Sequence, residues 1–297
     1  MKTSSFNTVG LIGRKQLAQV SETVSQVYQF LNQQGFQVVV AEGTNHCISQ
    51  SPNLIVSAED LGKYCDLIIV VGGDGSLLHA ARSAILHNKP ILGINQGHLG
   101  FLADIAPQAF SATLSEILTG QFVVEQRLVL EVEIFSKQQL FYKALAINDA
   151  VIKQGNNPSM LNFDIHIDKH CIASERADGI IVSSPTGSTA YALSAGGPIL
   201  HPRLQAYSLL TMFSHTLSNR PVVVPQESIT EISLSPKNLE DASFRCDGLE
   251  IIHIPAGSNI TIQSYPDKLQ LIHPFRYNYF DNLRDKLGWG KQSNHNR

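Results

Sequence analysis

The first 120 residues alternate between short apolar runs and longer segments with helical periodicity. The apolar runs predict β-strands at residues 8–12, 36–40, 66–71 and 90–95. Apolar residues recur at helical spacing from Leu17 to Leu31, with Gly35 as a C-cap, and further helices are expected at 76–86 and 107–120. Ser57 and Asp60 form a variant capping box for a short helix. Because strands and helices alternate, we expect an open parallel sheet with helices on both faces.

After about residue 121 the apolar residues recur with a period of two instead. Leu128, Leu130, Val132 and Ile134 fall on one face of a strand, and alternation returns at 161–168, 229–235, 243–254 and 259–265. This part is therefore expected to be a β-rich domain of mostly antiparallel strands. Residues 279–289 form an amphipathic helix expected to pack back on the first domain. The expected α/β domain is 1–124 with 275–297, and the β-rich domain is 125–274.

A glycine turn follows the third predicted strand and leads into a helix. It reads Gly72-Gly73-Asp74-Gly75, followed by Ser76. Glycines let the backbone approach a ligand closely, and the N–H groups at a helix start attract phosphate. A carboxylate repels phosphate, so Asp74 either caps the helix or takes part in chemistry as a proton acceptor or metal ligand.

Three further polar stretches interrupt the pattern. Residues 93–102, GINQGHLGFL, end the next strand, and Asn95 and Gly97 could line the crevice there, while Phe101 fits either the core or a base-stacking wall. Asn148 and Asp149 interrupt an apolar strand and form either a turn or a pair that recognises a ribose or base edge. Residues 177–199 crowd hydroxyls and glycines into one loop before a helix start near Thr189.

Composition narrows the class of protein. The 297 residues are 43% apolar and 16% charged with net charge −3, which indicates a globular chain without a basic field for nucleic acid or an anionic membrane. No signal peptide and no apolar run of membrane-spanning length is present, so a cytoplasmic location is expected. The four cysteines are far apart and are expected to be reduced. His166 and His170 have HxxxH spacing but fall on a strand and its turn, so a metal site there is not favoured.

Several common motifs are absent. The chain contains no GxSxG, no GxxxxGK[ST] and no GxGxxG. Their absence argues against an α/β-hydrolase with a serine nucleophile, a P-loop NTPase and an ordinary Rossmann dehydrogenase, respectively.

Taken together, the motifs resemble the NAD kinase family, in particular its bacterial branch. The resemblance covers nearly the whole chain and depends on GGDGSLL, NQGHLGFL, NDAVI, ADGIIVSSPTGSTAYALSAGGPI, FSHTLSNRPVVVP, CDG and LRDKLGW in the family's order. GGDG alone also occurs in lipid kinases and phosphofructokinases, whereas the long block with PTGSTAY is specific.

The resemblance implies an N-terminal α/β domain and a β-rich C-terminal domain, with NAD held between them. It implies transfer of a phosphoryl group from ATP to the 2′-hydroxyl of the adenosine ribose of NAD, giving NADP. A divalent metal ion, Mg²⁺, is implied with the ATP, and a homodimer or homotetramer is implied for the assembly.

The resemblance also assigns site residues. It implies Asp74 as the catalytic residue and Gly72, Gly73, Gly75 and Ser76 as the phosphate-donor turn. The residues that it implies for NAD binding are Asp74, Gly75, Phe101, Asn148, Asp149, Arg176, Asp178, Thr189, Ala190, Tyr191, Ala192, Leu193 and Ser194. No metal ligand is assigned.

Four positions depart from the family pattern. Ser76 replaces a common Thr and keeps the hydroxyl, while Asp149 replaces a commoner Glu and reaches less far. His79 stands where Arg or Lys is frequent, and Leu249 where Gln is frequent, which weakens the contacts carried over to them. Two other functions stay open: a non-catalytic NAD(P) sensor, which could dispense with Asp74, and a lipid kinase that shares GGDG.

Overall fold

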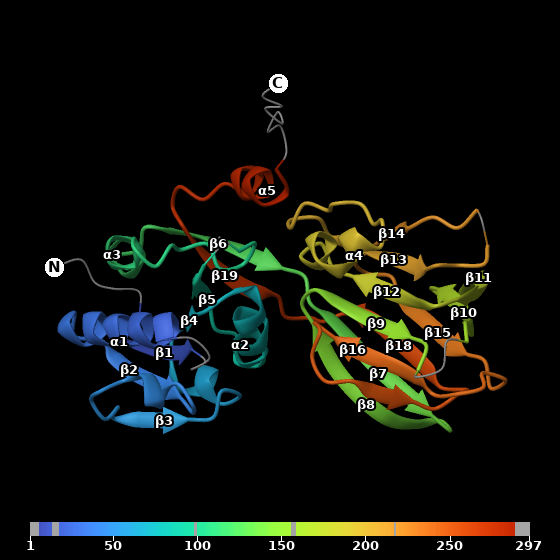
Figure 1. The fold of residues 1–297 in the computed structure, drawn as a ribbon, viewed down its shortest axis with the longest axis horizontal. Coiled ribbons are helices and arrows are strands. Elements are labelled where there is room, and N and C mark those ends of the chain that lie inside the picture. Colours follow the sequence, from blue (N-terminus) through green and yellow to red (C-terminus); the bar gives the residue numbers. More distant parts are fainter. Residues whose placement is uncertain (1–5, 14–17, 98–99, 156–158, 217, 289–297) are drawn as a thin grey trace. The chain divides into compact units, whose positions relative to one another are not determined.

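The structure is a computed structural model that describes residues 6–13, 18–97, 100–155, 159–216 and 218–288. The chain divides into two compact units, Met1–Gln126 with Leu269–Arg297, and Arg127–Lys268 (Figure 1). Leu17, Trp289 and the pair His98–Leu99, which belong to predicted motifs, lie outside the described residues.

The first unit is built on one seven-stranded sheet of order β3-β2-β1-β4-β5-β19-β6. The neighbouring pairs from β3 to β19 run parallel. Its strands are β1 (Thr8–Gly13), β2 (Gln37–Ala41), β3 (Leu54–Val56), β4 (Leu67–Val71), β5 (Ile91–Ile94), β6 (Phe122–Arg127) and β19 (Leu269–Pro274). Its helices are α1 (Ala18–Gln33), α2 (Asp74–Leu86), α3 (Phe110–Leu118) and α5 (Tyr279–Leu287). The predicted α/β fold is thus confirmed, with β3 and β6 as strands that the pattern did not predict.

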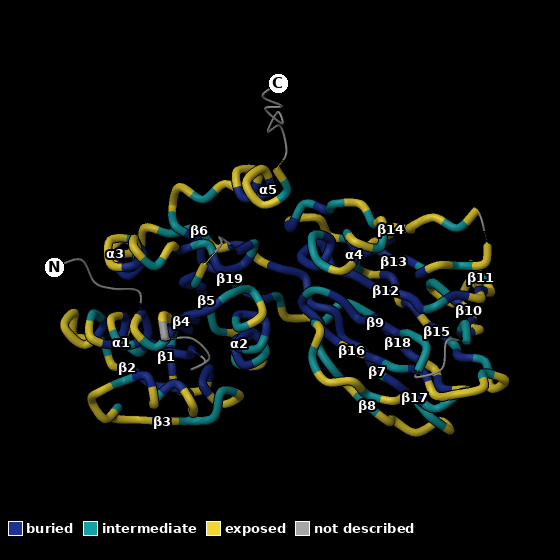
Figure 2. Tube along the Cα trace, viewed as in Figure 1, coloured by how far each residue is buried: buried dark blue, intermediate teal, exposed yellow. Residues whose placement is uncertain are grey.

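Helices cover both faces of this sheet because its strands present apolar side chains on both sides. Every residue of β4 is buried, and Figure 2 shows burial concentrated on the strands. On one face, Ile69 of β4 belongs to the same apolar cluster as residues of α1 and α3. On the other face, Leu77 of α2 lies so close to Gly93 that a Cβ there would be 2.9 Å from its side chain.

Two predicted helix starts differ from the structure. The Ser57–Asp60 box forms, since Asp60 N–H donates to Ser57 Oγ at 3.1 Å, but it precedes a 3₁₀ turn, Leu61–Tyr64, rather than an α-helix. The helix expected from residue 107 begins at Phe110, after a turn in which Ala109 N–H donates to the carbonyl oxygen of Ala106.

Strand β19 belongs to the first sheet, whereas residues up to 274 were expected in the β-rich domain. It pairs in parallel with β5, and Leu269, Leu271 and Ile272 are buried. Its partners are distant in sequence, so the local pattern shows a strand without showing which sheet it joins. The C-terminal helix α5 follows it within the first unit, as expected.

The second unit contains two six-stranded sheets. One has the order β11-β10-β15-β18-β7-β8 and the other β14-β13-β12-β9-β16-β17. The strands are β7 (Leu130–Ser136), β8 (Gln139–Ala146), β9 (Asp149–Lys153), β10 (Leu161–Ile167), β11 (His170–Ala177), β12 (Gly179–Ser183), β13 (Ala206–Met212), β14 (Val222–Pro225), β15 (Thr230–Leu234), β16 (Ala242–Cys246), β17 (Ile252–Ile254) and β18 (Asn259–Ser264). The described pairings within both sheets are antiparallel.

The core of this unit lies between the two sheets. The face predicted from the period of two is buried, since Leu130, Val132 and Ile134 pack in one cluster with Ile180 of the other sheet and Ile260. A one-residue slip would turn these side chains to solvent, so the apolar alternation fixes the register of the strands. The rigid sandwich then presents the loops and strand ends that carry the polar stretches.

Candidate active site

The predicted glycine turn joins β4 to α2 at the carboxyl end of a buried strand. Gly72 N–H donates to the carbonyl oxygen of Ile94 at 2.9 Å, and a Cβ at Gly72 would lie 2.6 Å from Ser76 Oγ, so the position requires glycine. Among the described residues, a Cβ at Gly73 or Gly75 would meet nothing within 4 Å. The backbone is thus open to a ligand at the start of a helix, where phosphate binds favourably.

The carboxylate of Asp74 binds a loop that follows β5. It accepts hydrogen bonds from the backbone N–H groups of Phe101 at 2.8 Å, Leu102 at 3.1 Å and Ala103 at 3.0 Å. Its side chain therefore holds this loop rather than capping α2. A carboxylate offers about four lone-pair sites, and Oδ2 receives one of these three bonds, so it can also accept a hydroxyl proton or bind a cation.

A second aspartate holds the predicted Asn148–Asp149 pair in the same way. Asp247 accepts hydrogen bonds from the backbone N–H groups of Ile147 at 3.0 Å, Asn148 at 2.7 Å and Asp149 at 3.2 Å. Asp247 adopts a left-handed backbone, with φ of 52°, which is uncommon outside glycine. This arrangement fixes the backbone of the pair and leaves the two side chains for recognition.

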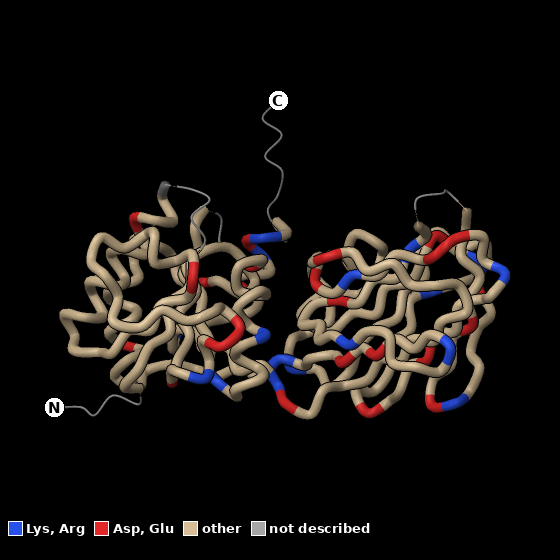
Figure 3. Tube along the Cα trace, turned by 90° about the horizontal axis from the view of Figure 1, so that it is seen from below, with Lys and Arg blue, Asp and Glu red and all other residues tan. Residues whose placement is uncertain are grey.

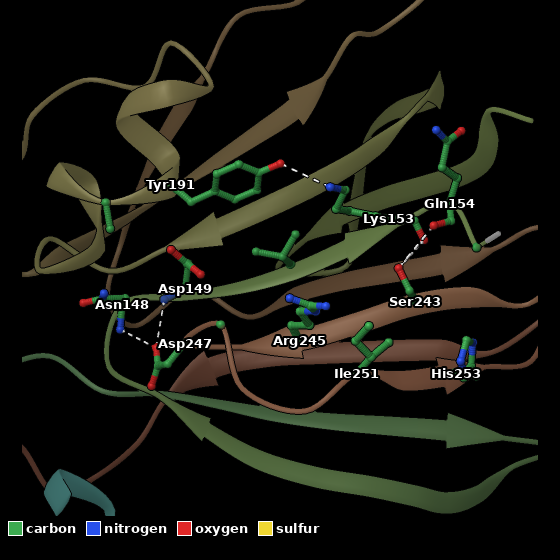
Figure 4. A pocket seen from close by; sticks show the side chains of 14 residues that line it. Asn148, Asp149, Lys153, Gln154, Tyr191, Ser243, Arg245, Asp247, Ile251 and His253 are labelled. Carbon is green, nitrogen blue, oxygen red and sulfur yellow. Dashed lines mark hydrogen bonds between the residues drawn. The ribbon is translucent and has the colours of Figure 1, made fainter. Parts of the chain in front are cut away.

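Asn148 and Asp149 line a cavity of about 810 Å³ within the second unit (Figure 4). Ala190 and Tyr191 line it from the block that precedes and begins α4 (Tyr191–Ser194). Lys153 Nζ lies 3.3 Å from the Tyr191 hydroxyl and 5.6 Å from the centre of its ring. The cavity is within the size range of small-molecule sites, and it combines an aromatic face with cations and hydrogen-bonding groups.

Several lining residues were not predicted from the sequence, namely Lys153, Gln154, Ser243, Arg245, Asp247, Ile251 and His253. Lys153, Ser243, Arg245 and His253 lie on strands, and strand register brings them together on one face of the sheet, whereas Gln154, Asp247 and Ile251 flank the strand ends. Ser243 of β16 lies opposite Lys153 of β9 and opposite His253 of β17. The period of two along each strand gives this face, but the pairing of strands far apart in the sequence does not follow from local pattern.

Asp149 has the most perturbed carboxyl group of this cavity. It is 5% exposed, and burial, followed by repulsion from the neighbouring Asp247, raises the pKa of Asp149 from 3.8 to about 7. The carboxyl group thus changes charge near neutral pH, where it can donate a hydrogen bond when protonated and only accept when ionised.

The folded protein is expected to lose stability as the pH rises from about 4 to about 7 through this group. Between these values the folded state binds a proton at Asp149 that the unfolded state has released, so stability falls with pH and levels off above about 7. Asp149→Asn should remove this dependence and raise the free energy of unfolding at pH 8 by up to about 4 kcal/mol. Urea unfolding of both proteins at pH 5 and pH 8 measures it; equal slopes with pH would refute the assignment.

The other predicted residues lie in different places. Phe101 lies in the first unit, on the loop bound by Asp74. Arg176, on β11, lines a separate cavity of about 620 Å³ in the second unit, and not the cavity of Asn148. Asp178 lies between β11 and β12, and its N–H donates to the carbonyl oxygen of Met212. The roles of these three residues stay predictions.

The predicted stretch from Thr189 to Ser194 forms the end of a 3₁₀ turn and the short helix α4. The Thr189 hydroxyl donates to the carbonyl oxygen of Thr186 at 3.3 Å. Ala192 is buried in a cluster with Val151 and Leu210, so its side chain serves packing. Leu193 is half-buried and Ser194 exposed on α4, and neither lines the cavity.

The described residues hold no cluster of metal ligands and no helix that could cross a membrane. Within them, no group of three or more His, Cys, Asp or Glu side chains could hold a metal ion. Mg²⁺ in nucleotide sites is commonly held by substrate phosphates, water and one or two carboxylates, a set to which Asp74 could contribute. No described helix has the length and apolar character to cross a membrane. Figure 3 shows acidic and basic residues interspersed within each unit.

Comparison with known proteins gives two family matches and many relatives. Residues 9–122 match the model of the ATP-NAD kinase N-terminal domain, and residues 147–274 match that of the ATP-NAD kinase C-terminal domain. A Coxiella burnetii protein named NAD kinase is 46% identical over 289 residues, which are 97% of this chain and 96% of the relative. The NAD kinase of Shewanella oneidensis is 43% identical over 98% of this chain and 99% of its own.

Two solved structures share the fold. Yeast NADH kinase complexed with NADH superposes with a TM-score of 0.88 at 21% identity, covering 100% of this chain and 95% of its own. An NAD kinase from Archaeoglobus fulgidus in complex with ATP superposes with a TM-score of 0.74 at 24% identity, covering 95% of this chain and 98% of its own.

Proposed function

Since this chain belongs to the NAD kinase family, we propose that it transfers the γ-phosphoryl group of ATP to the 2′-hydroxyl of the adenosine ribose of NAD, giving NADP and ADP. The observation that carries the proposal is the Gly72–Gly75 turn, where an open helix start adjoins a carboxylate fixed by three backbone N–H groups. A turn of this kind can bind phosphate and accept a proton in one place.

Asp74 acts as the base in the proposed reaction. A ribose hydroxyl is a poor nucleophile while protonated, and an oriented carboxylate that takes up its proton as the O–P bond forms lowers the barrier. The three bonds from the loop fix the orientation of the carboxylate. Phe101, on the same loop, provides an aromatic wall for the adenine of NAD.

The cavity of the second unit binds NAD in this proposal. Asn148 and Asp149 hydrogen-bond to the adenosine, and Tyr191 offers a ring for stacking. Lys153 and Arg245, which line the cavity, supply positive charge for ion pairs with the pyrophosphate of NAD. Asp178, Arg176 and Thr189–Ser194 are proposed as further contacts to the dinucleotide on the resemblance alone.

A divalent cation, Mg²⁺ in the proposal, offsets the charge of the donor phosphates when bound with ATP. The homodimer or homotetramer and the cytoplasmic location also stay proposals, as does NAD binding by the β-rich domain. The alternatives, an NAD(P) sensor and a lipid kinase, are not favoured by relatives that are named NAD kinase over nearly their full length.

Purified protein supplied with NAD, ATP and Mg²⁺ is expected to form NADP, and excess EDTA is expected to reduce the rate to background, because the phosphate charge loses its counterion. The measurement is product separation by chromatography, with NADH, GTP and polyphosphate tested in parallel to define acceptor and donor. A folded protein that binds NAD in calorimetry but forms no NADP would support the sensor instead.

A further inference from the structure

A completely buried histidine lies between two buried carboxylates in the first unit. His273, on β19, is 0% exposed; its Nδ1 lies 2.8 Å from Asp104 Oδ2 and its Nε2 3.3 Å from Glu125 Oε2. Both carboxylate side chains are 4% exposed. None of the three residues belongs to the motifs on which the proposed reaction depends.

The geometry indicates a role in positioning rather than in stability. Each ring nitrogen is paired with one of the two carboxylates, so the ring connects both partners and is held in one orientation. Buried ion networks contribute little net stability compared with apolar packing, and their best-attested effect is to fix one conformation. The conformation fixed here is that of Asp104, which directly follows the three residues whose N–H groups bind Asp74.

The same C-terminal segment reaches this loop a second time. Tyr277 stacks on the His273 ring, with ring centres 3.7 Å apart and planes 8° apart. Asn278 then caps α5 by accepting from Phe280 N–H, and Lys286, in the last turn of α5, lies 5.8 Å from the centre of the Phe101 ring. The two contacts lie at the two ends of loop 101–104.

We propose that the C-terminal segment, residues 269–288, positions loop 101–104 for the reaction, with His273 and Lys286 as positioning residues. His273 anchors the loop at Asp104, and Lys286 anchors it at Phe101. The loop orients the Asp74 carboxylate and carries Phe101, the proposed wall for adenine. Its position therefore determines both the orientation of the base and the binding of NAD. The proposal rests on the proposed function.

The experiment compares full-length variants for kcat, for KM of NAD and ATP separately, and for melting temperature. His273→Gln leaves one carboxylate without its partner, and kcat should fall by about 10–100-fold, because small misplacements of catalytic groups have effects of this size. Lys286→Ala should raise KM for NAD by about 2–5-fold, the value of an exposed cation–π contact, with KM for ATP unchanged. Lys286→Arg should restore the parent value. Arg284→Ala is the matched control, since Arg284 lies on the same helix and pairs with Asp281 within it.

Amide hydrogen exchange tests the positioning without any activity. In His273→Gln, the protection of the 101–103 amides should fall about tenfold or more, while that of β4 amides stays as in the parent. Unchanged protection, unchanged kcat in a folded His273→Gln protein, or an effect on KM for ATP instead of NAD would overturn the proposal. If His273→Gln does not fold, Lys286→Ala tests the proposal instead. A KM for NAD in Lys286→Ala equal to that of the parent then refutes the proposal. A parent that forms no NADP refutes the proposed function, and exchange then still tests the anchoring of the loop.

Discussion

Asp74→Asn is expected to lower kcat for NADP formation by about 10²–10⁴-fold, the usual contribution of an oriented base. The variant also has a structural effect, since an amide keeps one acceptor oxygen and presents an NH₂ group to N–H donors of the loop. A lost bond to a charged group costs about 1.5–3 kcal/mol, so the free energy of unfolding should fall as well. Steady-state kinetics, urea unfolding and NAD calorimetry on the same preparation separate these effects.

Asp66→Asn is the matched control for this variant. Asp66 directly precedes β4, whereas Asp74 lies three residues after its end, and Asp66 Oδ2 accepts from the backbone N–H groups of Asn7 and Thr8, each at 3.0 Å. Asp66→Asn should lose less stability than Asp74→Asn, because both N–H groups at Asp66 bond to one oxygen, which the amide can keep, whereas those at Asp74 bond to both oxygens. The kcat should fall in Asp74→Asn and stay at the parent value in Asp66→Asn.

The two roles of Asp74 differ in their response to Mg²⁺. Recovery of Asp74→Asn activity at high Mg²⁺ indicates a metal ligand, whereas a deficit that is independent of Mg²⁺ indicates the base. Near-parental kcat, with a loss of stability, would leave the carboxylate as a structural anchor of the loop and reject both chemical roles.

Asp247→Ala is expected to raise the Kd and the KM for NAD about tenfold or more, with a smaller change in kcat. The substitution removes the acceptor of three successive N–H groups and so releases the backbone that presents Asn148 and Asp149. It also removes the charge that repels the Asp149 carboxyl, so the pKa of Asp149 should fall towards its ordinary value. Calorimetry gives Kd, and initial rates give KM and kcat.

Asp168→Ala provides the control for Asp247→Ala. Asp168 also has a left-handed backbone, with φ of 49°, and its carboxylate accepts from Ile229 N–H at 2.8 Å. Both substitutions place alanine at a positive φ and remove a bond to the backbone. If both change NAD affinity equally, the effect comes from general destabilisation, and Asp247 has no particular role at the cavity.

Local pattern predicted much of the fold because strand and helix periodicity is a local property. The buried run of β4 and the alternation of β7 required no knowledge of distant residues. Strand β19 shows the limit: its apolar residues predict a strand, but its partner β5 lies far earlier in the chain, so its sheet could not be predicted. Helix α3 begins later than expected because Pro107 lies within a turn, closed by the bond from Ala109 N–H to the carbonyl oxygen of Ala106, that precedes the helix.

In the candidate site, too, the local pattern selects some residues but does not show the contacts between distant ones. Gly72–Gly75 and the Asn148–Asp149 pair could be selected because unusual residues interrupt a regular pattern. The contacts of these residues could not be predicted, although Phe101 is itself a predicted site residue, because Phe101 and Asp247 reach them across long sequence separations through bonds between a carboxylate and backbone N–H groups that leave no side-chain pattern. Lys153 and Arg245 follow an ordinary strand alternation, which does not distinguish a cavity wall from a solvated face.

Asp74 and Asp247 each bind three consecutive main-chain amides, and a main-chain amide is nearly the same in every residue type except proline, which has no N–H. Side chains at 101–103 and 147–149 can therefore be exchanged without removing the bonds that hold these loops. Substrate preference can thus diverge among descendants of this chain while the geometry of the loops is inherited unchanged. Proline is the substitution that such divergence has to avoid throughout both stretches.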